Sequence, residues 1–214
     1  MTIDEKLKVF FEGKKVVILG FGREGRSTLK LLGSCNCKSI TVADMNPVPE
    51  SEAEGCTLCC GEDYLTCLDD CDVIMKAPGV ILKNIVSDEI KAKITSQTDL
   101  FLRFCDNMII GITGTKGKST TSSLIKFFIE KSGKDTMLIG NIGVPPLERR
   151  EEFTKDCVIV CEMSCHQLEY VKASPDVAVL LNVYPEHLDH YTDFAAYRNA
   201  KLNIFRYQNE NDTL

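Results

Sequence analysis

The stretch Gly111-Ile112-Thr113-Gly114-Thr115-Lys116-Gly117-Lys118-Ser119-Thr120-Thr121 decides the fold of this chain. It follows the apolar run 108–110, which predicts a buried strand, and it precedes residues 122–129, whose apolar positions recur at helical spacing. A strand, a glycine-rich turn and a helix in this order are the context of a phosphate-binding loop. We therefore expect an α/β domain with a phosphate site at residues 111–121.

Each part of the predicted loop has a physical role in binding phosphate. Glycines let the backbone curl so that its N–H groups face one anion, and the helix N-terminus adds a partial positive charge. Lys118 can reach the outer phosphates, and the Ser119 hydroxyl can bind Mg²⁺. The usual pattern has four residues between its first glycine and Gly-Lys, whereas five separate Gly111 from Gly117. The loop is therefore a variant, and the alternative is a helix start with chance glycines.

Composition limits the classes of function. With 214 residues, 44% hydrophobic and 26% charged, the chain can form one large or two ordinary globular domains. A net charge of −6 argues against a broad nucleic-acid-binding surface. No apolar run approaches the ~18 residues of a membrane span, and residues 1–6 lack a signal-peptide pattern. We expect a cytoplasmic protein with neither nucleic acid nor membrane as a partner, in an oligomeric state that composition does not fix.

Eleven cysteines raise the question of disulfides or a metal. The groups Cys56-x-x-Cys59-Cys60 and Cys35-x-Cys37 resemble pairs of metal ligands. The count is odd, however, and several cysteines lie in apolar runs such as 157–161. This pattern favours reduced thiols that serve as small hydrophobic side chains in the cytosol.

The first half of the chain begins with a predicted nucleotide-binding unit. Residues 14–19 form a strand, Gly20-Phe21-Gly22-Arg23-Glu24-Gly25 fits G-x-G-x-x-G, and a helix ends near Gly33. A second strand, 39–43, ends at Asp44, an acid about 20 residues after the glycines, as suits a ribose hydroxyl in a Rossmann unit. The pattern predicts a Rossmann-like parallel sheet without fixing the nucleotide. A tight turn without ligand and an NAD(P)-dependent oxidoreductase are the alternatives.

The rest of the first half continues the same alternation. A strand at 72–76 runs into Ala77-Pro78-Gly79, and loops at the carboxyl ends of parallel strands are where such sheets bind ligands. Proline and glycine also simply form turns, so Gly79 is a weak candidate. The remaining expected elements are a strand at 56–60, a helix at 84–93, a last strand at 94–97 and a helix at 99–104. We place the boundary between two domains, 1–105 and 106–214, near 104–107.

The second half adds two strands that end in polar residues. Residues 158–160 form a buried strand that leads to Glu162, and a carboxylate there, close to the phosphate loop, is a candidate Mg²⁺ ligand. The strand 176–181 delivers a polar cluster at 182–190. Within it His187 is the better metal-ligand candidate, whereas His190 is expected at the surface or in packing.

The last predicted helix, 193–206, carries an unusual lysine. Phe194, Tyr197, Lys201 and Ile204 lie on one helical face, so Lys201 interrupts an apolar stripe. The usual explanation is a lysine that packs its stem and keeps its amine in water. A stripe through residues 195, 202 and 205 is equally helical, so the sequence leaves the buried face open.

At this point the chain resembles the Mur ligase family, the ATP-dependent amino-acid-adding enzymes of peptidoglycan synthesis. Five motifs in the family's order and spacing carry the resemblance: residues 113–121, 140–143, 162–169, 182–189 and 197–201. The Rossmann-like first domain limits the choice to members that add D-glutamate or L-alanine, and Gln167-Leu168-Glu169 favours D-glutamate. Lys116, Cys165 and His166 depart from the family's usual residues.

The resemblance implies a reaction and a set of site residues. ATP would convert the carboxylate of UDP-N-acetylmuramoyl-L-alanine into an acyl phosphate, which the amine of D-glutamate attacks. The implied catalytic residues are Lys118, Glu162, His187 and Lys201, and two Mg²⁺ sites would use Ser119 and Glu162, and His187 with a carbamylated Lys201. ATP would contact Gly114, Thr115, Lys116, Gly117, Lys118, Ser119, Thr120 and Thr121. The UDP substrate would contact Gly22, Arg23, Glu24, Asp44, Gly79 and Asn141.

The resemblance also implies that more sequence is needed for turnover. Family members carry a third domain that binds the amino acid and closes over ATP, and residues 106–214 cover only part of the central ATP-binding domain. We therefore expect a truncated chain that is inactive by itself.

Overall fold

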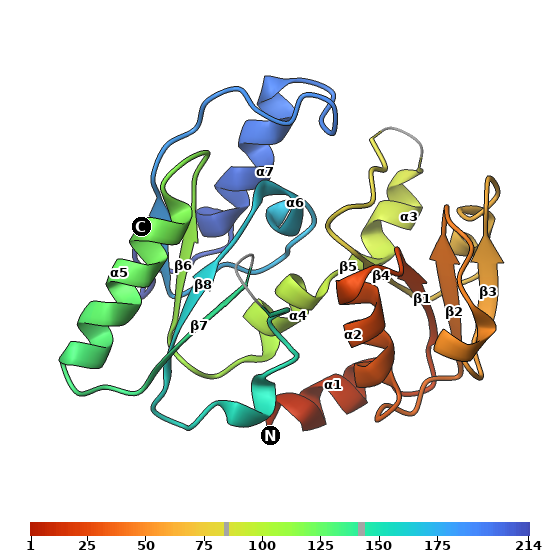
Figure 1. The fold of residues 1–214 in the computed structure, drawn as a ribbon, viewed down its shortest axis with the longest axis horizontal. Helices are drawn as coiled ribbons and strands as arrows, with labels where there is room; N and C mark the ends of the chain where they lie inside the picture. The colour runs from red at the N-terminus through yellow and green to blue at the C-terminus, as the bar shows by residue number, and fades with distance from the viewer. Residues whose placement is uncertain (84–85, 141–143) are drawn as a thin grey trace. The chain divides into compact units, whose positions relative to one another are not determined.

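The computed structural model describes residues 1–83, 86–140 and 144–214 (Figure 1). It divides into two compact units, Met1–Gln97 and Thr98–Leu214. Each unit is built on a parallel sheet with helices, so the predicted α/β class with parallel sheets is confirmed. The predicted limits at residues 105 and 106 stay a prediction.

Unit 1 contains a sheet of five strands among its described residues, in the order β3-β2-β1-β4-β5. Its central strand, β1, is apolar throughout Val16–Leu19, and these four side chains are at most 2% exposed. Burying an aliphatic side chain of this size contributes about 1.5–3 kcal/mol. The strands are β1 (Lys15–Leu19), β2 (Ser39–Asp44), β3 (Thr57–Cys60), β4 (Val73–Lys76) and β5 (Ile94–Thr95), and every pairing between neighbours is parallel.

Three α-helices accompany this sheet within the described part of unit 1: α1 (Ile3–Phe11), α2 (Arg23–Leu32) and α3 (Asp88–Lys93). Helix α2 follows β1 through the glycine-rich turn and ends at Gly33, as predicted. Its buried residues, Gly25, Thr28, Leu31 and Leu32, recur at helical spacing. The turn and the first residues of α2 therefore lie at the carboxyl end of the central strand.

Unit 2 contains a sheet of four described strands in the order β7-β8-β6-β9, again all parallel. The strands are β6 (Ile109–Thr113), β7 (Thr136–Gly140), β8 (Val158–Glu162) and β9 (Val177–Leu180). The helices are α4 (Gln97–Phe104), α5 (Lys118–Lys131), α6 (Cys165–Leu168) and α7 (Phe194–Arg206). The carboxyl ends of β6, β8 and β9 lead directly into the loop at 114–117, into α6 and into the polar cluster at 182–190.

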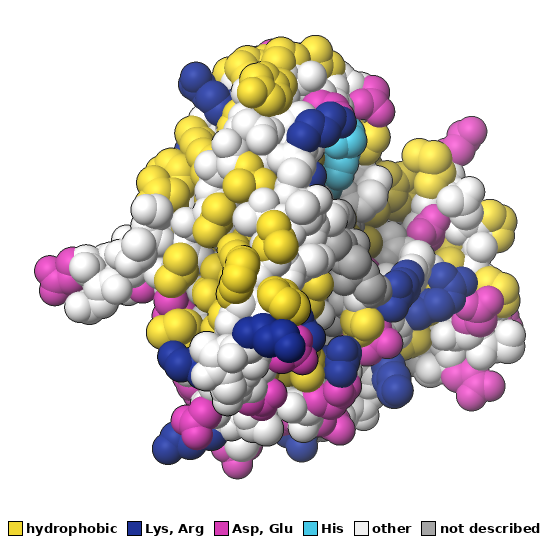
Figure 2. Space-filling view, turned by 60° about the vertical axis from the view of Figure 1, so that its left-hand side comes forward, with side chains coloured by type: hydrophobic (Ala, Val, Ile, Leu, Met, Phe, Trp, Pro, Cys, Tyr) yellow, Lys and Arg dark blue, Asp and Glu magenta, His cyan; other side chains and the backbone are white. Residues whose placement is uncertain are grey.

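Helix α5 leaves part of its apolar surface uncovered. Leu124, Phe127 and Phe128 are 51%, 46% and 66% exposed. Figure 2 brings the α5 side of the chain forward and shows hydrophobic side chains gathered there. No helix in the described ranges is long and apolar enough to cross a membrane.

Several predicted limits are wrong. Strand β6 continues through Gly111 to Thr113, so Gly111 belongs to the strand and not to the loop. A Cβ on Gly111 would lie 2.4 Å from Met163 Cε and 2.5 Å from Pro175 Cγ, so this glycine allows close packing on the sheet. Glu162 is likewise the last residue of β8 instead of lying beyond it.

The last part of unit 1, residues 84–97, also differs from the prediction. The expected strand 94–97 is limited to Ile94–Thr95, because Gln97 already begins α4. The expected helix 84–93 begins only at Asp88, where the Ser87 hydroxyl accepts a hydrogen bond from the Ile90 N–H and caps the helix. Residues 84 and 85 lie outside the described residues.

Candidate functional site

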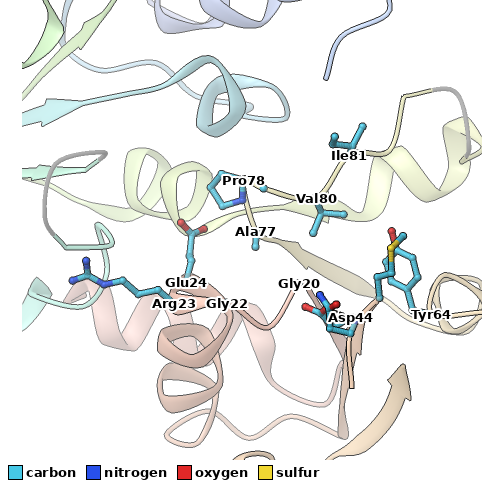
Figure 3. Close-up of a pocket in the computed structure, with 13 residues that line it drawn as sticks. Gly20, Gly22, Arg23, Glu24, Asp44, Tyr64, Ala77, Pro78, Val80 and Ile81 are labelled. Atoms are coloured by element: carbon cyan, nitrogen blue, oxygen red, sulfur yellow. Dashed lines mark hydrogen bonds between the residues drawn. The ribbon is translucent and has the colours of Figure 1, made fainter. Parts of the chain in front are cut away.

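Unit 1 has a cavity of about 510 Å³ at the carboxyl ends of β1, β2 and β4 (Figure 3). It has the position that open parallel sheets use for ligands. The lining residues are Gly20, Gly22, Arg23, Glu24, Asp44, Met45, Asn46, Tyr64, Ala77, Pro78, Gly79, Val80 and Ile81. All the first-domain residues predicted to contact the UDP substrate therefore line one cavity.

The glycines of the turn serve different purposes. Gly20 has φ +91°, and a Cβ on it would lie 2.6 Å from Val80 Cγ2. A Cβ on Gly25 would lie 2.2 Å from the carbonyl oxygen of Gly20, so these two glycines bring strand, turn and helix together. Gly22 has no atom within 4 Å of an added Cβ and lines the cavity. Its missing side chain leaves room for a ligand close to the backbone.

Asp44 supports the turn as well as lining the cavity. Its carboxylate accepts hydrogen bonds from the Phe21 N–H at 2.7 Å and from the Asn46 N–H at 2.8 Å. Tyr64 lies in the same wall, and burial together with the Asp44 charge raises the pKa of its phenol. The acid at the end of β2 thus fixes the shape of the glycine-rich turn.

Glu24 is the second carboxylate of the cavity. It lies in the first turn of α2, where Figure 3 shows its side chain directed toward the side of Ala77 and Pro78. Burial raises its pKa to about 7, against the opposing effects of Lys76 and of a hydrogen bond from the Gln97 N–H. Lys76 ends β4 and is only 3% exposed.

Unit 2 carries the predicted phosphate loop between β6 and α5, at residues 114–117. Gly117 has φ +88° and precedes Lys118, the first residue of the helix. The Lys118 amine donates hydrogen bonds to the carbonyl oxygens of Gly114 at 3.0 Å and Thr115 at 3.2 Å, so it folds back over the loop. Ser119 and Thr120 are exposed in the first turn of α5, and Thr121 is partly exposed.

Residues at the end of β9 hold the loop in place. The Asn182 carbonyl accepts from the Thr115 N–H, and its side-chain oxygen accepts from the Lys116 N–H, both at 3.0 Å. Thr115 Oγ1 lies 2.8 Å from the Tyr197 hydroxyl and accepts from the Tyr184 N–H at 2.9 Å. The Lys116 amine donates a hydrogen bond to the Glu186 carboxylate at 2.5 Å. The loop is therefore fixed by both the β9 end and α7.

Lys201 is buried beside the loop. It is 2% exposed, and its amine donates a hydrogen bond to the Gly114 carbonyl at 2.8 Å. Burial lowers its pKa to about 8, and the nearby Lys118 ammonium acts in the same direction, against Cys165 and Glu186. The stripe through Tyr197, Lys201 and Ile204 is therefore the buried face of α7, which the sequence left open. The usual explanation of such a lysine, an amine kept in water, does not apply to Lys201.

Glu162 ends β8, and His187 lies in the segment that follows β9; these two strands flank β6 in the sheet. Glu162 is 1% exposed and pairs in register with Ile112 of β6 and Gly140 of β7. His187 has φ +57°, and its ring lies 6.3 Å from that of Tyr197, whose own ring lies 5.0 Å from the Lys201 amine. Tyr197 thus contacts both His187 and Lys201.

The chain's histidines form one cluster. The His166 ring lies 4.8 Å from that of His187 and 4.3 Å from that of His190. His190 is 6% exposed and lies 3.1 Å from a Glu169 carboxylate oxygen. Of the two expected places for His190, at the surface or in packing, the structure confirms packing. His166 was missed as a neighbour of His187, because a four-residue helix, α6, gives no periodic signal.

The sequence of this chain is similar to those of known proteins. Residues 112–214 match the model of the Mur ligase middle domain. The chain is 36% identical to the UDP-N-acetylmuramoylalanine–D-glutamate ligase of Clostridium botulinum (strain Hall) and 34% identical to that of Clostridium kluyveri. Each alignment spans 219 positions and covers 98% of this chain. The chain belongs to the Mur ligase family. It spans about half the length of these curated relatives, 48% of each.

A solved Mur ligase has the same fold as this Mur ligase chain. It is UDP-N-acetylmuramate:L-alanyl-γ-D-glutamyl-meso-diaminopimelate ligase from Neisseria meningitides, which superposes with a TM-score of 0.50 at 20% identity. The match covers 93% of this chain and 70% of that one. At this identity the likeness shows the fold alone.

The structure thus brings most of the predicted site residues of this Mur ligase chain into two groups, one in each unit. Asn141 lies outside the described residues. Sequence reasoning missed Tyr64 in the cavity wall and Lys76, whose charge acts on Glu24. It also missed Asn182 and Tyr197 at the loop. Asn182 was visible as the first polar residue after an apolar strand, whereas the others carry no local signal.

Proposed function

We propose that this chain is part of an ATP-dependent, cytoplasmic ligase that joins D-glutamate to UDP-N-acetylmuramoyl-L-alanine in peptidoglycan precursor synthesis. The two relatives from Clostridium, both named as D-glutamate-adding ligases, support this substrate pair. One observation carries the proposal for the chemistry: two lysines, Lys118 and Lys201, donate to the same carbonyl oxygen, that of Gly114, in the phosphate loop.

The loop residues would bind and orient ATP. The Thr115 and Lys116 N–H groups already donate to Asn182. The phosphates would therefore bind at the first turn of α5, from Lys118 onward, where backbone N–H groups lack intrahelical acceptors and the helix dipole favours phosphate. Lys118 would leave the loop carbonyls for the β- and γ-phosphate oxygens, where charge accumulates as the γ-phosphoryl group moves to the substrate carboxylate. Positioning and charge neutralisation are the main contributions that a protein can make to this step.

The side chains near the loop provide only some of the ligands that Mg²⁺ needs. In the described ranges, no group of three or more His, Cys, Asp or Glu side chains is arranged to hold a metal ion. Mg²⁺ is commonly held by one or two carboxylates together with substrate phosphates and waters, which suits Ser119 and Glu162 as ligands of one ion. When bound, the ion would neutralise phosphate charge.

Lys201 could be a ligand of the second proposed Mg²⁺ only after its amine is carbamylated. As an ammonium it would repel a metal, but a pKa of about 8 leaves part of the amine neutral near pH 7. The neutral amine can add CO₂ and release one proton, which gives a carbamate anion. That carbamate and His187 would be the ligands of a second Mg²⁺.

The cavity of unit 1 would hold the uridine diphosphate of the substrate. The helix start at Gly22, Arg23 and Glu24 suits the diphosphate, while Asp44 and Gly79 would lie near the uracil and ribose. An NAD(P)-binding oxidoreductase would use the same cavity but leaves the phosphate loop and the two lysine contacts with Gly114 without a role.

Isothermal titration calorimetry of the 214-residue chain tests the proposal. We expect binding of UDP-N-acetylmuramoyl-L-alanine, with weaker binding of UDP-N-acetylmuramic acid and none of NADH. Preference for UDP-N-acetylmuramic acid would instead indicate the L-alanine-adding member of the family. Tight NADH binding without binding of either UDP ligand would overturn the proposal.

A further inference from the structure

The cavity of unit 1 contains a carboxylate where an anion is expected. Glu24 is in the first turn of α2, directly after Gly22 and Arg23, and all three line the cavity. A helix N-terminus favours phosphate, but an ionised carboxylate in the same turn repels it. If the cavity binds a diphosphate, as the proposed function requires, Glu24 has to be accommodated.

The surroundings of Glu24 make its ionisation costly. Among the described residues, the buried Lys76 of β4 and the Gln97 N–H favour the ionised form of Glu24, but burial outweighs both. On its own helix, Arg23 is exposed, and Figure 3 shows its side chain directed away from the side where Asp44 and Tyr64 lie. Arg26 is bound to Glu52 and to the Phe21 carbonyl.

The other carboxylate of the cavity has a different role. Asp44 faces the cavity from β2, but its two oxygens accept the Phe21 and Asn46 N–H groups. Both Asp44 oxygens are thus engaged by the protein's own backbone. Glu24 is therefore the carboxylate of the cavity that an incoming diphosphate would meet.

We propose that Glu24 binds the diphosphate of a nucleoside diphosphate ligand in its protonated form, as a hydrogen-bond donor, so that each ligand brings one proton into the cavity. This inference rests on the proposed function. The carboxylate takes the proton from the buffer, and its O–H then donates to a phosphate oxygen. A second negative charge nearby raises the pKa of a carboxyl group further, so the proton stays with Glu24 in the complex.

The free carboxyl has a pKa of about 7, which sets the pH range of the effect. Below pH 6 the free chain already holds the proton, and binding takes up almost none. At pH 7 binding takes up about half a proton, and at pH 8.5 nearly one. The dissociation constant then rises about tenfold for each pH unit above 7, because one proton is linked to binding.

Calorimetry with UDP-N-acetylmuramoyl-L-alanine tests this inference. Its phosphates are diesters that stay ionised throughout pH 5.5–9, so they add no proton of their own. Titrations of the 214-residue chain in buffers of different ionisation enthalpy give the number of protons taken up at each pH. We expect this number to rise from near zero at pH 5.5 to near one at pH 8.5.

Two variants separate Glu24 from other titrating groups. Glu24→Gln keeps a hydrogen-bond donor but cannot titrate, so we expect pH-independent affinity and no proton uptake. At pH 8.5 it should bind about tenfold or more tightly than the unsubstituted chain. Glu89→Gln is the matched control, since Glu89 also lies in the first turn of a helix, α3, but is exposed and does not line the cavity. It should behave like the unsubstituted chain.

The outcomes distinguish the two claims. If neither the chain nor Glu24→Gln binds the UDP ligand at any pH, the proposed function fails. If the ligand binds without proton uptake and with the same affinity at pH 6 and pH 8.5, only the role of Glu24 fails. Weaker binding by Glu24→Gln than by the unsubstituted chain at pH 8.5, with an unchanged circular dichroism spectrum, would likewise refute it, because the ionised carboxylate would then aid binding.

Discussion

The Lys201 amine lies 2.8 Å from the carbonyl oxygen of Gly114 and joins α7 to the phosphate loop. Tyr197, one helical turn earlier, joins the same two parts through Thr115. Because residues four apart lie on one face of a helix, a single face of α7 supports the loop at two adjacent positions. The loop and this helix should therefore respond together to substitution.

Removing the Tyr197 hydroxyl should cost stability without creating a large cavity. In Tyr197→Phe the ring stays but the 2.8 Å hydrogen bond to Thr115 is lost, and both groups are buried. We expect the free energy of unfolding to fall by about 1–2 kcal/mol. Urea denaturation measures this, with Tyr207→Phe as a control at a 46% exposed position, where no change is expected. Equal losses in both variants would contradict the role of the buried hydroxyl.

Lys118→Ala should weaken binding of MgATP. A charge-assisted hydrogen bond contributes about 1.5–3 kcal/mol, which corresponds to a loss of roughly ten- to hundredfold in affinity. The control is Lys126→Ala on the same helix, since Lys126 pairs with Glu130 at the surface. Titration with a fluorescent ATP analogue would show the difference, and unchanged affinity in Lys118→Ala would remove the loop from the proposed site.

The glycines of the first turn should separate folding from binding. In Gly25→Ala the new Cβ would lie 2.2 Å from the Gly20 carbonyl oxygen, so we expect a loss of several kcal/mol in the free energy of unfolding. In Gly22→Ala the Cβ meets no atom within 4 Å. Stability should then change by less than about 1 kcal/mol, while affinity for the UDP ligand falls because the methyl group enters the cavity. Thermal unfolding and calorimetry on both variants provide the comparison.

Glu24 should make stability depend on pH even without a ligand. Its folded pKa, about 7, exceeds the ordinary value of 4.5, so between these values the folded chain binds more protons than the unfolded chain. Stability from this group is therefore lost as pH rises from 4.5 to 7, by at most about 3 kcal/mol. The difference in unfolding free energy between Glu24→Gln and the unsubstituted chain should grow over this range. A constant difference would show that the burial of Glu24 has no such cost.

The sequence predicts the parts of the fold that local patterns define. Both glycine-rich turns follow a strand and precede a helix, as the spacing predicts, although β6 extends further into the second turn than predicted. The sequence also contained a signal that was not used: Thr2 and Glu5 form a capping box, which marks the start of α1. That helix could have been predicted.

Other features depend on contacts between distant residues. Nothing local distinguishes Gly111 as a strand residue, since its reason is the approach of Met163 and Pro175. Burial of the Lys201 amine required the position of Gly114, 87 residues earlier. The pKa of Glu24 in α2 similarly depends on burial in the folded unit and on the charge of Lys76 in β4. Such properties follow from tertiary packing, which spacing along the chain does not encode.

The hydrogen bonds that Asp44 accepts from the Phe21 and Asn46 N–H groups have a consequence for inhibitor design. Because the protein's own carboxylate secures the glycine-rich turn, the floor of the cavity has its shape before any ligand arrives. A ligand then loses little affinity to ordering the backbone. Compounds built on a rigid scaffold should consequently suit this cavity better than flexible ones of the same size.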